Sequence, residues 1–238
     1  MDLTVVIPVF NEVESIRELV EEVRRRLDGK FDYEVVVVDD GSTDSTSAVL
    51  MECRRGFPRL RVLHHQTCCG QSAAVCTGVD AAAAPVIATL DGDGQNDPAD
   101  IPALYQAWQG ATAGVSLVTG YRRRRHDTWL KRFSSRVANA VRGGFLNDNT
   151  PDTGCGLKVF SRETFRLLPR FDHMHRFLPA LVQMQGGKTL SVEVNHRERR
   201  RGISKYGMFN RLWVGIVDLL GVKWLQRRTR RPVVSELQ

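Results

Sequence analysis

Two kinds of hydrophobic pattern alternate along the first 120 residues of the chain. Short, almost continuous apolar runs are typical of strands buried on both faces, and longer stretches with apolar residues three or four positions apart are typical of helices. The expected strands are residues 3–9, 33–38, 60–63, 86–90 and 115–119, and the expected helices are residues 14–27, residues 71–84 and a segment after Pro98. This order predicts an α/β fold with a mostly parallel, doubly wound sheet.

The second half of the chain has a different character. After residue 121 come arginine-rich helical segments, short strands near residues 157–160 and 190–195, and an amphipathic helix from about Met208. We interpret this part as a basic, helical C-terminal elaboration of the same sheet. The predicted divisions are residues 1–120, residues 121–206 as the other half of the same domain, and a tail of residues 207–238.

Charge separates the two halves more sharply than the overall net charge of +7 suggests. Residues 1–120 contain nine Lys and Arg against eighteen Asp and Glu, a net charge of −9, whereas residues 121–238 contain 25 against nine, a net charge of +16. The acidic half suits a metal ion or a donor-rich polar ligand. The basic half suits phosphates, nucleic acid or an anionic membrane surface.

Cysteine use and hydropathy predict a cytoplasmic protein. The five cysteines are an odd number without a CxxC pair, so we expect reduced thiols. The N-terminus lacks the basic and apolar regions of a signal peptide. The apolar stretch 212–225 is interrupted by Asp218 and Lys223, and it is shorter than the roughly 20 residues that span a bilayer. We interpret His64, His65, His173 and His175 as lacking carboxylate or cysteine partners at ligand spacing, so no zinc site is expected.

Carboxylates follow two of the predicted strands. Asp91-Gly92-Asp93-Gly94-Gln95 comes directly after strand 86–90, and Asp39-Asp40-Gly41-Ser42 follows strand 33–38. Ligands of parallel α/β sheets bind at the carboxyl ends of the strands, and oxygen ligands on a turn suit Mg²⁺ or Mn²⁺. Taken singly, the DGDGQ motif favours an ordinary acidic turn, and Asp39-Asp40-Gly41-Ser42 is equally compatible with a helix-capping turn. Convergence of both motifs with Glu12 on one edge favours a ligand site.

Three motifs in order resemble a known family. Residues 5–12 (VVIPVFNE), 36–44 (VVVDDGSTD) and 91–95 (DGDGQ) are similar to the family 2 inverting glycosyltransferases of GT-A fold. The resemblance covers about residues 3–207. Gly120-Tyr121-Arg122 and the string Gly202-Ile203-Ser204-Lys205-Tyr206 are most similar to the polyprenyl-phosphate branch, typified by dolichol-phosphate mannose synthase.

The resemblance implies roles for individual residues of the acidic half. The nucleoside of a nucleotide-sugar would be held by Pro8, Phe10, Glu12, Val38 and Asp40. Asp91, Asp93 and Gln95 would hold the metal and the diphosphate, with Asp93 and Gln95 as ligands of Mg²⁺ or Mn²⁺. Asp91 and Gly92 would belong to the donor-binding residues.

In the basic half, the resemblance implies that Arg122, Arg199 and Lys205 act with Asp93 in catalysis, by neutralising the leaving group and orienting an acceptor phosphate. Arg132 and Ser135, three residues apart on one expected helix face, are candidates for that phosphate; a solvated surface helix is an equal alternative.

The activity implied is inverting transfer of a hexose, by default from GDP-mannose, to a polyprenyl phosphate at the cytoplasmic face of a membrane. The alternative is a family 2 enzyme that uses a UDP-sugar or a lipid, polysaccharide or protein acceptor. The final helix, with Trp213, Trp224 and a basic end, fits either a peripheral membrane helix or a core-packing helix. Nucleic-acid binding is disfavoured because the basic runs lack interleaved aromatic residues.

Overall fold

The computed structural model describes residues 1–122, 142–148, 150–197 and 208–230, with only the backbone for residues 208–212. Seven strands form one sheet: β1 (Leu3–Val9), β2 (Tyr33–Asp39), β3 (Leu60–His64), β4 (Val86–Thr89), β5 (Val115–Tyr121), β6 (Lys158–Ser161) and β7 (Lys188–Glu193). The helices are α1 (Ile16–Leu27), α2 (Thr46–Gly56), α3 (Gln71–Ala81), α4 (Ile101–Gln109), α6 (Arg162–Arg166), α7 (Leu178–Met184) and α8 (Met208–Arg228), with short 3₁₀ helices η1 (Pro98–Asp100) and η2 (Met174–Arg176).

The sheet has the order β3-β2-β1-β4-β6-β5-β7. The strands β3, β2, β1 and β4 are parallel, β5 and β7 are parallel, and β6 runs antiparallel to both of its neighbours. The expected α/β fold with a mostly parallel sheet is therefore confirmed, with β6 as the exception. The chain passes from β1 to β2 on one side of the β1–β4 pair, and from β4 to β5 on the other side. A topological switch point therefore lies where β1 and β4 end.

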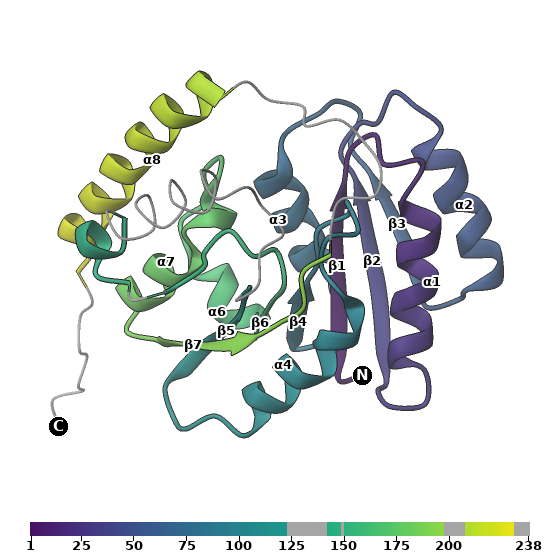
Figure 1. The fold of residues 1–238 in the computed structure, drawn as a ribbon, viewed down its shortest axis with the longest axis horizontal. Helices are drawn as coiled ribbons and strands as arrows, with labels where there is room; N and C mark the ends of the chain where they lie inside the picture. Colours follow the sequence, from purple (N-terminus) through teal and green to yellow (C-terminus); the bar gives the residue numbers. More distant parts are fainter. Residues whose placement is uncertain (123–141, 149, 198–207, 231–238) are drawn as a thin grey trace, which may run out of the picture.

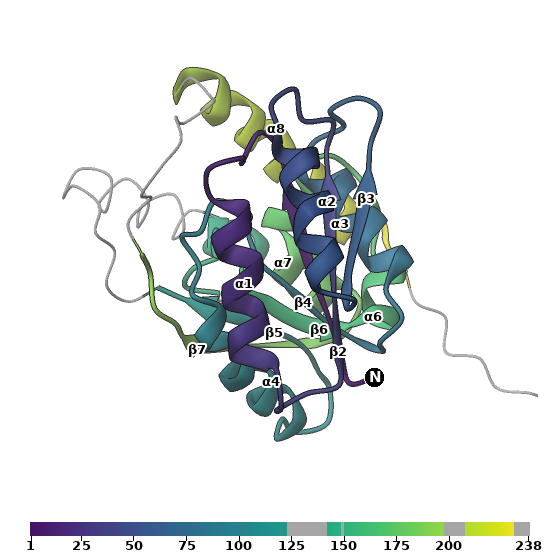
Figure 2. The same cartoon turned by 90° about the vertical axis from the view of Figure 1, so that its right-hand side faces the viewer.

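Helices cover both faces of the sheet (Figures 1 and 2). On one face, α1, α2 and α4 pack against the sheet through residues such as Val20, Leu50 and Leu104. On the other face, α3 and α7 pack through Val79 and Leu181 in a second core cluster. Because β1 and β2 are covered on both sides, every residue of these two strands is buried, which explains their continuous apolar sequence.

Several element boundaries differ from those expected by one or a few residues, and two of the differences have a clear physical cause. The helix predicted over residues 71–84 ends at Ala81, and Ala82 already has extended backbone angles. Pro85 disfavours helical geometry at the residue before it, so the chain leaves the helix early. The last strand begins at Lys188 rather than at residue 190, because the Lys188 N–H donates to the carbonyl of Gly114 beside β5.

Helix α8 packs along one side and exposes the other. Val222 is buried in the second core cluster, and Asp218 Oδ2 lies 3.0 Å from His173 Nδ1. Trp213 and Trp224 are 70% and 59% exposed, and Val217 and Leu220 on the same stripe are also exposed. Within the residues described, no helix combines the length and the apolarity needed to cross a bilayer. The helix therefore contributes to the core while presenting an apolar stripe outward.

Candidate active site

Two of the sequence motifs meet at the switch point. The loop after β1 and the turn after β4 are joined by Ser15, whose Oγ lies 3.0 Å from Glu12 Oε2 and 3.1 Å from the carbonyl oxygen of Gly92. Gly92 is buried, and a Cβ there would lie 2.6 Å from Val9 Cγ1, so only glycine fits this close approach. The predicted convergence of Glu12 and the DGDGQ turn thus follows from the parallel strands β1 and β4.

Asp91 lies at the centre of the site. Gln71 Nε2, on the first residue of α3, donates to Asp91 Oδ1 at 2.8 Å. Burial and the nearby charge of Asp93 raise the pKa of Asp91 to about 6, while Lys158 and Arg122 act in the opposite direction. Gly156 packs directly against this carboxyl group, so a larger residue at position 156 would overlap it.

Residues from the second half complete a small pocket beside Asp91. Pro8, Gln71, Asp91, Lys158 and His175 are among its lining residues. The Lys158 ammonium is buried and donates to the carbonyl of Cys155, and burial lowers its pKa. Sequence reasoning did not select Gln71, Lys158 or His175, because none lies in a recognisable motif and only the fold brings them together. The short strand expected near residues 157–160 was the one available signal for Lys158.

The DGDGQ turn fits a hard divalent cation. Burial is the main cause of the raised pKa of Asp91, and the charge of Asp93 is the second; a bound cation would relieve the repulsion between the two carboxylates. Asp93 Oδ1 accepts a hydrogen bond from the Gln95 backbone N–H at 3.1 Å, which closes the turn. Carboxylate and amide oxygens are the ligands that Mg²⁺ and Mn²⁺ prefer. Asp93 and Gln95 therefore remain the candidate metal ligands.

Arg122 reaches the same edge from the end of β5. Its Nε and Nη2 atoms donate to the two oxygens of Asp152, at 2.7 and 3.0 Å. Burial disfavours the charge of Arg122, but the hydrogen bonds and the charge of Asp152 prevail and raise its pKa, with a smaller contribution from Asp91. Asp152 is thus the ion-pair partner of Arg122.

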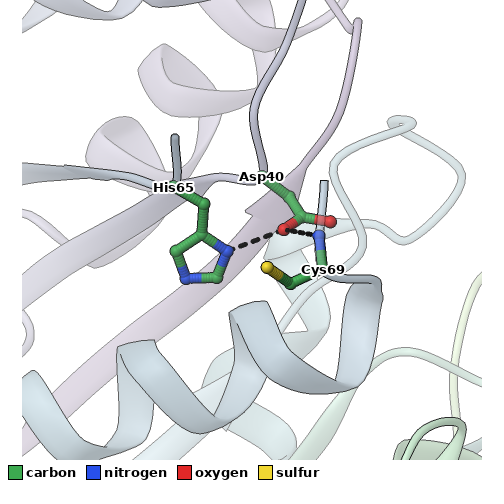
Figure 3. A group of neighbouring side chains, drawn as sticks. All are labelled: Asp40, His65 and Cys69. Carbon is green, nitrogen blue, oxygen red and sulfur yellow. Dashed lines mark hydrogen bonds and ion pairs between the residues drawn. The ribbon is translucent and has the colours of Figure 1, made fainter. Parts of the chain in front are cut away.

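Asp40 is held by four groups around its carboxylate, of which His65 and the Cys69 N–H are drawn in Figure 3. Oδ1 lies 2.7 Å from His65 Nδ1 and accepts from the Cys69 N–H at 2.9 Å; Oδ2 accepts from the Gly70 N–H at 2.8 Å and from Cys68 Sγ at 3.2 Å. Burial alone would raise the pKa of Asp40, but these hydrogen bonds outweigh burial and lower it. The carboxylate is therefore ionised and closely fixed.

Of the remaining predicted residues, two lie in the described part of the chain and four lie outside it. Phe10 is half-buried at the end of β1, whereas the Val38 side chain is fully buried in a core cluster with Val36 and Ala74. A nucleoside could therefore meet Val38 only through its backbone. Four predicted residues lie outside the described part of the chain: Arg132, Ser135, Arg199 and Lys205.

The structure is a mostly parallel α/β sheet with carboxylates at its switch point, and comparison with known proteins gives its family. Residues 4–168 match the model of glycosyl transferase family 2, and the chain belongs to that family. It is 35% identical to a dodecaprenyl-phosphate galacturonate synthase of Rhizobium johnstonii, over 98% of this chain and 69% of the relative. It is 34% identical to an undecaprenyl-phosphate 4-deoxy-4-formamido-L-arabinose transferase of Edwardsiella ictaluri, over 87% of this chain and 63% of the relative. The chain thus spans about two thirds of the length of these relatives.

Solved structures confirm the GT-A-like fold. Glucosyl-3-phosphoglycerate synthase from Mycobacterium tuberculosis, in complex with Mn²⁺, uridine diphosphate and phosphoglyceric acid, superposes with a TM-score of 0.71. The match covers 97% of this chain and 80% of that chain, at 17% sequence identity. The same enzyme has also been solved with Mg²⁺ and uridine diphosphate. At this level of identity the likeness concerns the fold.

Proposed function

We propose that this chain transfers a glycosyl group from a nucleotide-sugar to a polyprenyl phosphate. The observation that carries the proposal is the convergence of Asp91, Lys158 and Arg122 at the switch point of a family 2 sheet. The similar proteins named above act on dodecaprenyl or undecaprenyl phosphate. Those names support a uronic acid or a modified amino sugar as the transferred group, and they give no support to the default of mannose from GDP-mannose.

The proposed reaction is a single displacement at the anomeric carbon. A phosphate oxygen of the acceptor forms the new bond to this carbon on one face, while the bond to the diphosphate breaks on the other and the nucleoside diphosphate leaves with the electron pair. The configuration is inverted. A phosphate monoester with a second pKa of about 6 is largely ionised at neutral pH, so a dedicated general base is not required.

The residues of the chain divide the work by charge. Asp40 and Glu12 would orient the nucleoside, and Asp93 and Gln95 would hold Mg²⁺ or Mn²⁺, which supplies positive charge for the diphosphate. Arg122, held in a fixed orientation by Asp152, would neutralise charge on the leaving group. Arg199 and Lys205 are proposed to add to this stabilisation, and Arg132 and Ser135 to bind the acceptor phosphate.

Helix α8 supports a peripheral attachment to the cytoplasmic face of a membrane. Its exposed stripe of Trp213, Val217, Leu220 and Trp224 is followed by Arg227 and Arg228 at the end of the helix. An apolar stripe with tryptophans and a basic end fits an anionic lipid surface. This placement would bring the site to an acceptor that resides in the bilayer.

A screen of donors tests the proposal directly. The chain is incubated with a short polyprenyl phosphate, Mn²⁺ or Mg²⁺, and separately UDP-galacturonate, UDP-glucose or GDP-mannose, and release of UDP or GDP is measured. We expect release that requires the acceptor, is greatest with the uronic acid donor, and is lost in Asp93→Ala. Release with a protein or polysaccharide acceptor but not with polyprenyl phosphate would contradict the acceptor assignment.

A further inference from the structure

A second group of potential metal ligands lies at the nucleoside end of the site, apart from the DGDGQ turn. Asp40 follows β2, His65 follows β3, and Cys69 lies in the loop before α3. One ligand atom from each of these three residues lies within 4.8 Å of the other two (Figure 3). Cys68 and Cys69 are both exposed, and Cys68 Sγ is 3.2 Å from Asp40 Oδ2. An ion can therefore reach a cluster with oxygen, nitrogen and sulfur ligands.

The chemistry of these atoms selects a different class of ion from that expected at Asp93. Thiolate and imidazole favour borderline-soft ions such as Zn²⁺, whereas Mg²⁺ and Mn²⁺ favour oxygen. Zinc binds sulfur at about 2.3 Å and nitrogen or oxygen at about 2.0–2.2 Å, so ligand atoms of a tetrahedral site are roughly 3.3–3.8 Å apart. The separations of up to 4.8 Å between the ligand atoms require only small side-chain movements to reach this geometry.

The surroundings of the cluster resemble the supporting shell of a metal site. His65 Nε2 lies 2.9 Å from Thr77 Oγ1, so the ring can donate from Nε2 and leave Nδ1 free to bind a metal. The backbone N–H groups of Cys69 and Gly70 fix the Asp40 carboxylate. The loop itself is held closely, because a Cβ on Gly41 would lie 2.7 Å from the Cys68 nitrogen. The side chains of Asp40, His65 and Cys68, whose Sγ lies 3.2 Å from Asp40 Oδ2, are therefore oriented before any ion arrives.

We propose that Asp40, His65 and Cys69, with Cys68 as a fourth ligand, form a binding site for Zn²⁺ or a similar borderline-soft divalent cation. Binding forms bonds from the metal to one carboxylate oxygen, to His65 Nδ1 and to two thiolates. The thiol protons of Cys68 and Cys69 are released to solvent, and the imidazole proton moves to Nε2, where it is donated to Thr77. Affinity therefore rises with pH. The expectation from sequence that His65 lacks ligand partners fails here. Cys68 and Cys69 follow His65 by three and four residues, and Asp40, 25 residues before it, is brought beside it only by the fold.

The site has a regulatory consequence that rests on the proposed function. If Asp40 orients the nucleoside of the donor, then a cation bound to Asp40 removes that carboxylate from the nucleoside. Occupancy by Zn²⁺ and binding of the donor would then exclude one another, and Zn²⁺ would inhibit transfer in competition with the nucleotide-sugar.

Cobalt substitution tests the metal site without measuring activity. The full chain, in reducing buffer freed of metal, is titrated with Co²⁺ and followed by the thiolate-to-cobalt charge-transfer absorption; Zn²⁺ is then added to displace the Co²⁺. Oxygen-only binding at the DGDGQ turn produces no such band. We expect one thiolate-bound Co²⁺ per chain, with Cys69→Ser and His65→Gln each weakening binding roughly tenfold or more and Thr77→Val weakening it by roughly tenfold.

Controls separate ligand loss from misfolding. His64→Gln, at the exposed neighbouring histidine, keeps all five thiols and should bind Co²⁺ as the unmodified chain does. Metal-free unfolding temperatures establish that Cys69→Ser and Thr77→Val remain folded. The double variant Cys68→Ser, Cys69→Ser should show no charge-transfer band. Absence of the band in the unmodified chain, or an unchanged band in the folded double variant, would overturn the proposal.

Discussion

Arg122 and Asp152 form a two-point ion pair that connects the end of β5 to the loop before β6. The guanidinium nitrogens lie 2.7 and 3.0 Å from the two carboxylate oxygens, and the side chains are only 14% and 3% exposed. A planar guanidinium held at two points loses its freedom to rotate. Asp152 therefore acts as a positioning residue that directs Arg122 toward the Asp91 edge of the site.

Asp152→Asn should impair both stability and turnover. The substitution keeps the size of the side chain but leaves the Arg122 charge largely buried and unpaired, at a cost of about 2–4 kcal/mol in the free energy of unfolding. In the proposed reaction the reoriented guanidinium lowers kcat by at least about tenfold. Denaturant unfolding and donor-dependent kinetics measure the two effects. Asp80→Asn, which breaks the exposed pair with Arg170, is the matched control and should cost less than about 1 kcal/mol. A normal kcat in folded Asp152→Asn would contradict the positioning role.

Gly156→Ala should displace the central carboxylate. A methyl group at position 156 overlaps the carboxyl group of Asp91, and Gly156 cannot retreat easily because its carbonyl accepts from Thr89 Oγ1 at 2.7 Å. We expect at least a tenfold loss of transferase activity and weaker activation by Mn²⁺, measured by metal titration of the rate. Gly56→Ala is the control, because a Cβ at Gly56 meets nothing within 4 Å. Equal metal activation in Gly156→Ala and the unmodified chain would rule out this account of the glycine.

The pattern of apolar residues was sufficient to predict the strands and the faces of the sheet, because burial on both sides of β1 and β2 leaves a direct mark on the sequence. The same pattern does not record strand direction, so the antiparallel insertion of β6 between β4 and β5 was not foreseen. Carboxylates at strand ends were predictable from the turn motifs. Their partners were not, since Gln71 reaches Asp91 across 20 residues and Arg122 reaches Asp152 across 30.

The exposed stripe of α8 should bind anionic membranes. We expect the chain to associate with vesicles of phosphatidylglycerol and phosphatidylcholine, and the association to weaken as salt rises. Trp213→Ser with Trp224→Ser removes two large exposed apolar side chains and should weaken vesicle binding at least about tenfold. Leu167→Ser, which removes an exposed apolar residue elsewhere, is the control and should bind normally. Sedimentation with vesicles measures all three, and equal binding by the tryptophan variant would exclude the stripe as the contact.

Uridine should compete with Co²⁺ if Asp40 serves both the nucleoside and the second cation site. The nucleoside is used because it lacks the phosphates that chelate metals. We expect added uridine to reduce the charge-transfer absorption of the Co²⁺-loaded chain, whereas ribose alone leaves it unchanged. A band that is lost in the Cys68→Ser, Cys69→Ser variant but insensitive to uridine would leave the cation site intact and would remove Asp40 from the nucleoside site.

His175 should make the folded chain less stable in acid. Burial, together with the nearby charges of Lys158 and Arg176, lowers the pKa of His175 from 6.5 to about 3, and its Nδ1 lies 2.7 Å from Ser72 Oγ. Between these two values the unfolded chain takes up a proton that the folded chain does not, so stability falls as pH falls below 6.5, by at most about 1.4 kcal/mol per pH unit.

His175→Gln removes this contribution, so its free energy of unfolding should decline less between pH 7 and pH 5 than that of the unmodified chain. Ser72→Ala keeps the imidazole and should retain the full decline, although its stability at pH 7 falls by about 1 kcal/mol. Parallel pH dependences in His175→Gln and the unmodified chain would show that His175 titrates alike in the folded and unfolded states.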